Sequence, residues 1–243
     1  MIQNVSLSGC GWLIPYHVGV LKCLLERGVI CKDRCVLSGV SGGAIVAAGV
    51  KSNVSLSDVS EMMTACADRI RNAENGQFVG NMGYVLREML DDVLPSNAHE
   101  ITSGEIKIGV LTSRFDLKIF SNFDSKKDLI DACVASSHIP FYMDRHAFYH
   151  WRGKRWLDGG LLDILPPSDS EEEIKSLPYP ILAKFRADRK QIVSPQAQSF
   201  SLVRELLPYT FVPPNDNGEW FSRLDECGRK DTETYLMERG YIG

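Results

Sequence analysis

The fold of this 243-residue chain is decided by residues 35–50, which read CVLSGVSGGAIVAAGV. Residues 35–38 form a short apolar run typical of a buried strand, and residues 44–50 are apolar enough for a buried helix. Between them, Gly39-Val40-Ser41-Gly42-Gly43 matches the G-x-S-x-G pattern of a nucleophile elbow, in which small neighbours let a serine stand on a tight strand-to-helix turn. Ser41 is therefore the candidate nucleophile, and the dipole of the following helix would favour negative charge beside it.

The same order of elements precedes this stretch. Residues 5–7 form a predicted strand that enters the turn Gly9-Cys10-Gly11-Trp12, and a helix is predicted from Tyr16 to Arg27. Two successive strand–turn–helix units favour a parallel sheet covered by helices. Glycines in the first turn would let consecutive backbone N–H groups point into a pocket, as an oxyanion hole requires. A phosphate-binding loop and a plain strand-to-helix connection are the alternatives at this turn, although no G-x-x-x-x-G-K-S/T motif occurs.

Periodicity predicts the remaining elements. Helices are expected over residues 57–73, 84–94 and 129–136, and hairpins over 106–120 and 147–157. Residues 168–173 are expected to form an acidic surface loop or the first turn of a helix, and residues 180–185 a strand. The last predicted helix, residues 220–239, is interpreted as a lid or clamp over the main domain.

A third motif, Asp158-Gly159-Gly160, follows a predicted strand, so its carboxylate would stand on an open turn. A serine hydroxyl needs a base to take its proton, and a buried carboxylate within hydrogen-bond reach can serve. In α/β-hydrolases the order is serine, acid, histidine, whereas all five histidines here precede Asp158. Asp158 is therefore the favoured base, and Asp116 or Asp131 acting with His146 remains the alternative.

Together these motifs resemble the patatin-like phospholipase family. The turn at Gly9, the elbow at Ser41 and Asp158-Gly159-Gly160 stand in that family's order. The phrases at residues 9–20, 135–140 and 156–166 resemble its short adiponutrin-type branch, and a weaker likeness continues through residues 194–196 and the last helix. One departure concerns the first motif, G-x-G-x-x-G, whose last glycine is replaced by Ile14 with Pro15 next.

The resemblance implies a patatin-like three-layer α/β sandwich with a mixed, largely parallel central sheet between helices. We expect a catalytic domain over residues 1–167, with residues 168–243 packed on the same domain as a strand and helices. The resemblance also implies a dyad of Ser41 and Asp158, which uses neither a cofactor nor a metal. The expected oxyanion donors are Gly9, Cys10, Gly11 and Gly42. The glycines expected to shape the elbow and the turn after Asp158 are Gly39, Gly43, Gly159 and Gly160.

Composition narrows the partners. The formal net charge is −4 and no long run of lysine and arginine occurs, which disfavours nucleic-acid binding. The first ten residues lack a basic start and a long apolar stretch, and no 18-residue apolar run is present. We therefore expect a cytoplasmic protein with, at most, peripheral contact with membranes or lipid droplets. The hairpin around Trp151, Arg152 and Trp156 is one hypothesis for that contact; two half-buried tryptophans under a solvated turn are the other.

The predicted function is hydrolysis of lipid carboxylic esters, such as glycerophospholipids or acylglycerols, through an acyl-enzyme. A lipid transacylase would use the same dyad with an alcohol as acceptor. A catalytically silent lipid-binding protein would keep the fold, but Ser41 and Asp158 are both present. A nucleotide-binding protein would need the lysine and acidic partners that the glycine-rich turns here lack.

Overall fold

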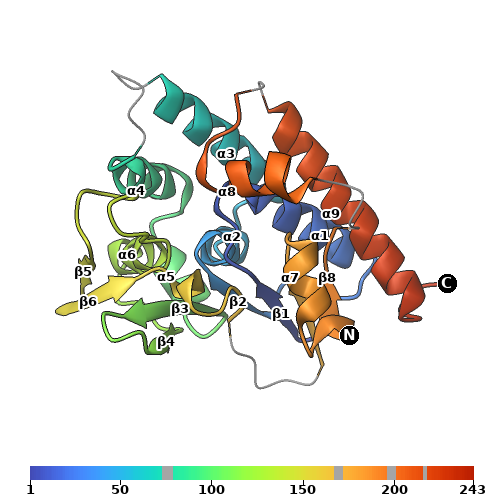
Figure 1. Ribbon diagram of the computed structural model, residues 1–243. Helices are drawn as coiled ribbons and strands as arrows, with labels where there is room; N and C mark the ends of the chain where they lie inside the picture. The colour runs from blue at the N-terminus through green and yellow to red at the C-terminus, as the bar shows by residue number, and fades with distance from the viewer. Residues whose placement is uncertain (73–78, 167–171, 196–200, 216–217) are drawn as a thin grey trace.

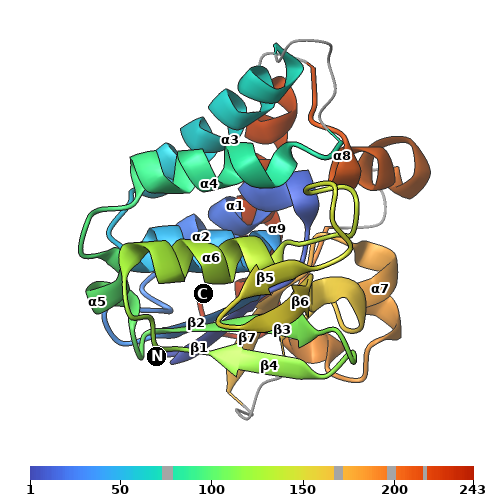
Figure 2. The same cartoon turned by 90° about the vertical axis from the view of Figure 1, so that its left-hand side faces the viewer.

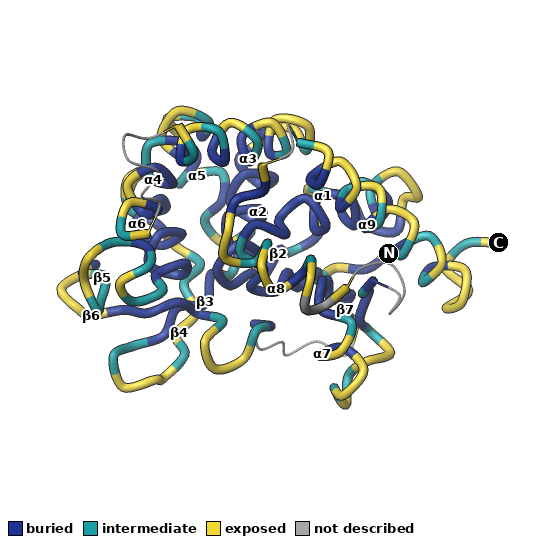
Figure 3. Tube along the Cα trace, turned by 45° about the horizontal axis from the view of Figure 1, so that its top comes forward, coloured by how far each residue is buried: buried dark blue, intermediate teal, exposed yellow. Residues whose placement is uncertain are grey.

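The computed structural model describes residues 1–72, 79–166, 172–195, 201–215 and 218–243. Strand β2 (Val36–Val40), which leads to Ser41, lies at the centre of its sheet. Strands β1 (Asn4–Leu7) and β3 (Ile106–Thr112) pair with it in parallel on either side. These strands are largely buried, as the dark blue trace in Figure 3 shows, and their apolar residues, among them Val5, Leu37 and Ile108, belong to the core.

The sheet has eight strands in the order β5-β6-β3-β2-β1-β7-β8, with β4 also paired to β3. On one side of β1, strands β7 (Glu173–Ser176) and β8 (Ile192–Val193) extend the parallel part. On the other side, β4 (Leu117–Phe120), β6 (Lys154–Leu157) and β5 (Tyr149–Trp151) are antiparallel to their neighbours. The fold is therefore α/β with a mixed, mostly parallel sheet and flanking helices, as predicted (Figure 1).

Helices cover the sheet where periodicity predicted them (Figure 2). Two of them begin with recognisable caps: Ser55 and Asp58 form a capping box, and the hydroxyl of Ser125 accepts from the backbone of Asp128. In chain order the predicted helices are α1 (Ile14–Glu26), α2 (Gly42–Lys51), α3 (Leu56–Arg71), α4 (Met82–Val93) and α6 (Lys126–Ser136). The short helix α5 (Ala98–Thr102) was not predicted.

The last helix, α9 (Glu219–Glu238), lies along α1, so the two ends of the chain pack together (Figure 1). The crossing is close because glycines stand at it: a Cβ on Gly19 would lie 2.0 Å from the carbonyl oxygen of Asp225, and one on Gly228 would lie 2.3 Å from that of Tyr16. Helix α9 therefore acts as a clamp on α1. The interpretation of this helix as a lid is wrong, because none of its residues lines the cavity described below.

In the C-terminal part, one prediction is wrong and a second is wrong at its last residue, Glu173. Residues 180–185 form helix α7 (Pro180–Phe185) and not a strand, because proline in the first turn of a helix has its φ already set and needs no hydrogen-bond acceptor. The strand beside β1 is β7, which begins at Glu173, the last residue of the expected acidic loop. Its charged residues are buried because Lys175 pairs with Asp188 at 2.7 Å and Glu173 accepts a hydrogen bond from Ser6. Residues 167–171 lie outside the described residues.

The hairpin of β5 and β6 does not present its tryptophans to solvent. Trp151 is 5% exposed and Trp156 is 2% exposed. The Trp151 ring donates through Nε1 to Asp128 at 2.8 Å, and Trp156 Nε1 donates to the carbonyl of Trp151 at 2.8 Å. Arg152 forms an ion pair with Asp128. The hypothesis that this hairpin enters a lipid surface is therefore wrong, and the alternative of packed tryptophans under a turn is the better description.

Candidate active site

Ser41 stands between the last residue of β2 and the first residue of α2, with φ 52° and ψ −126°. A non-glycine residue with positive φ is uncommon and strained, which is typical of a nucleophile elbow. The glycines around it make the turn possible. A Cβ on Gly39 would lie 2.4 Å from the Gly43 carbonyl group, and one on Gly43 would lie 2.2 Å from the Leu7 carbonyl oxygen. The backbone geometry is thus that of the predicted elbow.

A side chain that sequence reasoning did not single out holds this turn in place. The backbone N–H of Ser41 donates to the hydroxyl of Ser136 at 2.8 Å, and that hydroxyl donates to the carbonyl of Gly109 at 2.7 Å. Ser136 is fully buried at the end of α6. It therefore connects the strained residue to β3. The only signal in the sequence was a hydroxyl residue inside an otherwise apolar helix end.

Asp158 follows β6 directly, and its side chain reaches Ser41. Hydrogen bonds from the Ser41 hydroxyl and from the backbone N–H of Gly160, the latter 2.7 Å long, stabilise its carboxylate. The Asp158 N–H donates to the His138 carbonyl at 2.8 Å, which fixes the backbone on the other side. Burial outweighs these bonds and raises the pKa of Asp158 to about 6, since a buried carboxyl loses hydration.

A carboxyl with this pKa is a stronger base than an exposed aspartate, yet it is still mostly ionised at neutral pH. Ser41 is 8% exposed and Asp158 is 4% exposed, so few water molecules can compete for their hydrogen bond. The Asp158 carboxylate can therefore take the proton of the Ser41 hydroxyl directly, without a histidine between them.

The expected oxyanion donors lie where the two glycine-rich turns meet. A Cβ on Gly42 would lie 2.6 Å from Cys10 Sγ and 3.2 Å from the Gly11 carbonyl oxygen. Across the described ranges, the N–H groups of Cys10, Gly11 and Gly42 have no protein acceptor. Gly9 is a correction, because its N–H donates to the Ile164 carbonyl at 2.7 Å and is not available to an oxyanion. Gly9 instead anchors the turn.

Ile14, which stands where the family motif has its last glycine, is the first residue of helix α1. A short 3-10 turn over Gly11–Leu13 leads into α1 at Ile14, with Pro15 in the first turn of the helix. Ile14 is buried and contributes to the wall of the cavity beside Ser41. Ile14 is thus both the first residue of α1 and part of the cavity lining.

An apolar cavity of about 370 Å³ opens beside Ser41 and Asp158. One wall comes from Ile45 on α2, Met63 on α3 and Leu86 on α4. The outer wall comes from the segment after Gly160 and from helices α7 and α8 (Leu207–Phe211). An extended hydrocarbon chain suits such a lining, because apolar groups gain free energy when they leave water.

Among the described residues, no histidine and neither of the alternative acids lines the cavity beside this pair. His17 is buried, with Nδ1 2.7 Å from the Ser176 hydroxyl, and burial lowers its pKa to about 4. His146 lies 3.4 Å from Asp144. Asp131 is held by ion pairs with Arg87 and Lys127. Neither these groups nor Asp116 line the cavity, so the alternative of Asp116 or Asp131 acting with His146 is excluded.

Comparison with known proteins agrees with this geometry. Residues 5–169 match the patatin-like phospholipase family. The human "1-acylglycerol-3-phosphate O-acyltransferase PNPLA3" is 33% identical over 98% of the chain, which spans 51% of that protein. The human "Patatin-like phospholipase domain-containing protein 4" is 28% identical over 98% of both chains. The mouse "Omega-hydroxyceramide transacylase" is 27% identical over 68% of the chain and 28% of its own length. The chain thus spans about half of the first of these relatives and 28% of the last.

Solved structures resemble the whole fold at low sequence identity. VipD from Legionella pneumophila superposes with a TM-score of 0.67 at 12% identity, covering 98% of this chain and 67% of VipD. The type III effector protein ExoU gives a TM-score of 0.54 at 15% identity, covering 99% of this chain and 54% of ExoU. The sheet order, the elbow at Ser41 and the family match all lead to one conclusion: the chain belongs to the patatin-like phospholipase family.

Proposed function

We propose that this protein is a serine acyl hydrolase that cleaves lipid carboxylic esters with Ser41 and Asp158. One observation carries the proposal: a buried carboxyl with a pKa of about 6 faces a strained serine at an apolar cavity of about 370 Å³. A base and a nucleophile in contact are what acyl transfer requires. The cavity selects the substrate class, since its lining offers the acyl chain apolar contacts and few polar ones.

In the first step, Asp158 takes the proton of the Ser41 hydroxyl while Oγ attacks the ester carbonyl carbon. The carbonyl oxygen becomes an oxyanion, which the N–H groups of Cys10, Gly11 and Gly42 stabilise. As the intermediate collapses, Asp158 returns the proton to the leaving alcohol and an acyl-serine remains. In the second step, Asp158 takes a proton from water, the hydroxide oxygen attacks the acyl carbon, and the proton returns to Ser41 as the fatty acid leaves.

Transfer of the acyl group to a lipid alcohol is the second candidate activity. Two relatives are named as an acyltransferase and a transacylase, and the dyad is buried, which limits the access of water to the acyl-serine. Both activities use the same first step. They differ only in whether water or an alcohol enters the second, so product analysis with added monoacylglycerol separates them.

The first experiment is labelling with a fluorophosphonate probe, followed by mass spectrometry of the modified peptide. Wild type is expected to label at Ser41, and Ser41→Ala and Asp158→Asn are expected to lose labelling while keeping the wild-type circular dichroism spectrum. Ser222→Ala, which alters an exposed serine on α9, is the matched control and should label as wild type does. A folded wild type that stays unlabelled would overturn the proposal in favour of a silent lipid-binding protein.

A further inference from the structure

We propose that an apolar rim at the cavity mouth is the surface on which this protein docks to a phospholipid surface. The rim comprises exposed side chains from three segments that are distant in sequence, namely Leu161, Leu162, Ile181, Leu182, Phe185 and Phe211. The inference deepens the proposed function and rests on it, because a lipid-ester hydrolase must meet its substrate at an interface. The Trp151 ring cannot form this docking surface, because it is buried.

The rim is unusual because large apolar side chains are exposed together. Phe185 is 82% exposed and Leu162 is 62% exposed, and Ile181 and Leu182 are close to half exposed. Contiguous apolar surface on a folded protein marks sites of interaction with proteins, membranes or ligands. The exposed residues of α7 and α8 are coloured yellow in Figure 3.

The rim is continuous with the cavity. Leu161, Ile181, Leu182 and Phe211 line the cavity and are also exposed, so each side chain contacts both the interior and solvent. Helices α7 and α8 lie on the same side of the molecule as the segment that follows β6 (Figure 2). A lipid that leaves a membrane at this rim could pass its acyl chain directly to Ser41 without crossing water. This continuity favours a lipid surface over a protein as the occupant.

The rim is held on a firm backbone. The Tyr179 and Thr210 hydroxyls lie 3.0 Å apart and hydrogen-bond, and the Tyr142 hydroxyl donates to the Phe211 carbonyl. The backbone of α8 touches the first glycine-rich turn so closely that a Cβ on Gly11 would lie 1.9 Å from the Thr210 carbonyl oxygen. The exposure of the rim therefore belongs to the packed fold and does not come from a poorly attached segment.

The charges beside the rim favour phospholipid head groups. Lys184 stands on α7 between Leu182 and Phe185, is exposed, and has no ion-pair partner within the described part of the chain. The acidic groups nearby are paired as well: Asp163 and Asp188 both form ion pairs with Arg186, and Asp188 forms a second one with Lys175. Apolar side chains flanked by a free cation are typical of elements that lie in the membrane interface. We therefore expect tighter binding to anionic than to zwitterionic vesicles.

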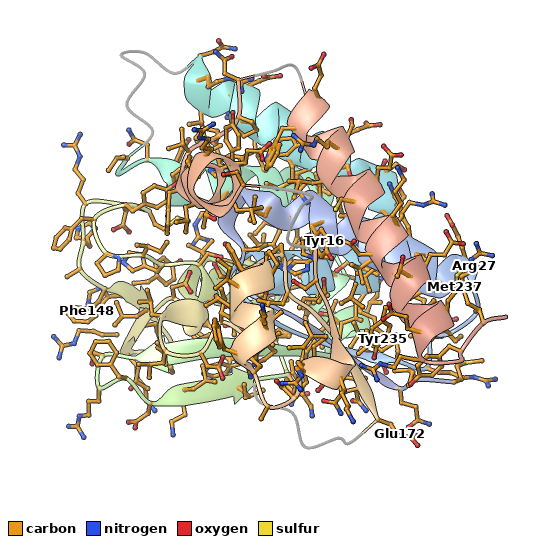
Figure 4. The ribbon with its side chains drawn as sticks, turned by 45° about the vertical axis from the view of Figure 1, so that its right-hand side comes forward. Tyr16, Arg27, Phe148, Glu172, Tyr235 and Met237 are labelled. Atoms are coloured by element: carbon orange, nitrogen blue, oxygen red, sulfur yellow. The ribbon has the colours of Figure 1, made fainter. Side chains whose placement is uncertain are left out.

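Flotation with vesicles tests this surface. The probe is a vesicle of phosphatidylcholine with 20 mol% phosphatidylserine, compared with pure phosphatidylcholine, and Ser41→Ala is used so that no lipid is consumed. We expect Leu162→Ser/Phe185→Ser to lower the partition coefficient about tenfold or more, because two large apolar contacts are lost. Lys184→Gln should lower it about fivefold on anionic vesicles only. Met237→Ser is the matched control, since Met237 is exposed at the far end of α9 (Figure 4).

Hydrolysis of a soluble short-chain ester separates this proposal from the proposed function. Leu162 and Phe185 do not line the cavity, so the double variant made in the active enzyme should cleave the soluble ester at the wild-type rate. Equal vesicle binding by the double variant and the Met237→Ser control would overturn the docking surface and leave the hydrolase intact. A wild-type dimer that the double variant dissociates would overturn it as well, in favour of self-association. Vesicle binding without ester cleavage would instead overturn the proposed function.

Discussion

At the scale of single residues, Ser41 and Asp158 are useful because each is held in an unfavourable state. The backbone of Ser41 has φ 52°, and burial raises the pKa of Asp158 to about 6. Both conditions cost folding free energy, and the surrounding packing offsets it. We therefore expect both the activity and the stability of the protein to depend on the ionisation of Asp158.

Acylation of Ser41 should rise with pH and reach half its maximum near pH 6. Asp158 accepts the proton only when ionised, and its pKa is about 6 in the fold. The measurement is the single-turnover rate of acylation by a soluble ester between pH 4.5 and 8.5. Asp158→Asn should lower this rate by about a thousandfold or more and remove the pH dependence. A wild-type midpoint below pH 5 would show that another group titrates.

Asp158→Asn should stabilise the fold at pH 8 and leave it unchanged below about pH 4. The folded pKa of about 6 lies above the ordinary value of 3.8, so folding disfavours the ionised form and stability falls as pH rises through this range. Asparagine avoids that cost, which is worth up to about 3 kcal/mol at 1.36 kcal/mol per pKa unit. Chemical denaturation at both pH values measures it. Asp163→Asn, an exposed carboxylate, is the control and should show no such gain.

At the scale of elements, the site is assembled by contacts between helices and strands that are distant in sequence. The end of α6 reaches β3 and the elbow through Ser136, and α9 clamps α1, which begins directly after the first glycine-rich turn. Such contacts place the elbow and that turn. They are therefore expected to matter for both rate and stability.

Ser136→Ala should lower the acylation rate and leave KM for a soluble ester nearly unchanged. The substitution leaves the Ser41 N–H and the Gly109 carbonyl without their partner, at a cost of about 1–3 kcal/mol for each buried group. The elbow would lose its support, but the cavity would keep its lining. Ser137→Ala is the matched stability control, because that buried hydroxyl has no partner among the described residues. An unchanged acylation rate with lowered stability would mean that Ser136 is only structural.

Gly228→Ala should destabilise the protein by about 2 kcal/mol or more. Its new Cβ would lie 2.3 Å from the Tyr16 carbonyl oxygen, so α9 would have to move away from α1. Thermal unfolding measures the change, which should be a drop of several degrees in Tm for a chain of this size. Thr234→Ala on the same helix alters an exposed position and should leave Tm unchanged. Equal Tm values for the two variants would contradict the close crossing.

At the scale of the whole molecule, the cavity is a product of the complete fold. Its walls come from the first, middle and last thirds of the chain, and its mouth bears the apolar rim. The volume of about 370 Å³ sets how much of an acyl chain can be buried beside Ser41. Under the proposed function, we therefore expect chain-length preference to depend on the packing between α2, α3 and α4.

Leu86→Trp should shift the preference towards shorter acyl chains. The larger ring would fill part of the inner cavity, and each methylene excluded from it forfeits about 0.8 kcal/mol, or about fourfold in kcat/KM. The measurement is kcat/KM across a series of p-nitrophenyl esters of increasing chain length. Tyr84→Trp, on the exposed face of the same helix, is the control and should keep the wild-type profile. An unchanged optimum in Leu86→Trp would place the acyl chain elsewhere.

The sequence by itself determined the local geometry of the site. Gly39 is required within the turn itself, because a Cβ there would lie 2.4 Å from the Gly43 carbonyl group only four residues further on. Helical and strand periodicity likewise predicted most elements, since it depends on near neighbours. The order of the motifs favoured Asp158 as the base for Ser41, and the family resemblance supported that pairing.

Only the tertiary structure decided which side chains are buried and which polar groups are already hydrogen-bonded within the protein. The Gly9 N–H is bound to Ile164, Ser136 supports Ser41 from α6, and Trp151 is covered while the rim around Phe185 is exposed. Which segment lies beside β1 was likewise decided by the fold: β7 takes that place, and residues 180–185 do not. These outcomes depend on contacts between residues far apart in the chain, and no local pattern records them. The pKa of Asp158 follows the same rule, because burial is a property of the whole fold.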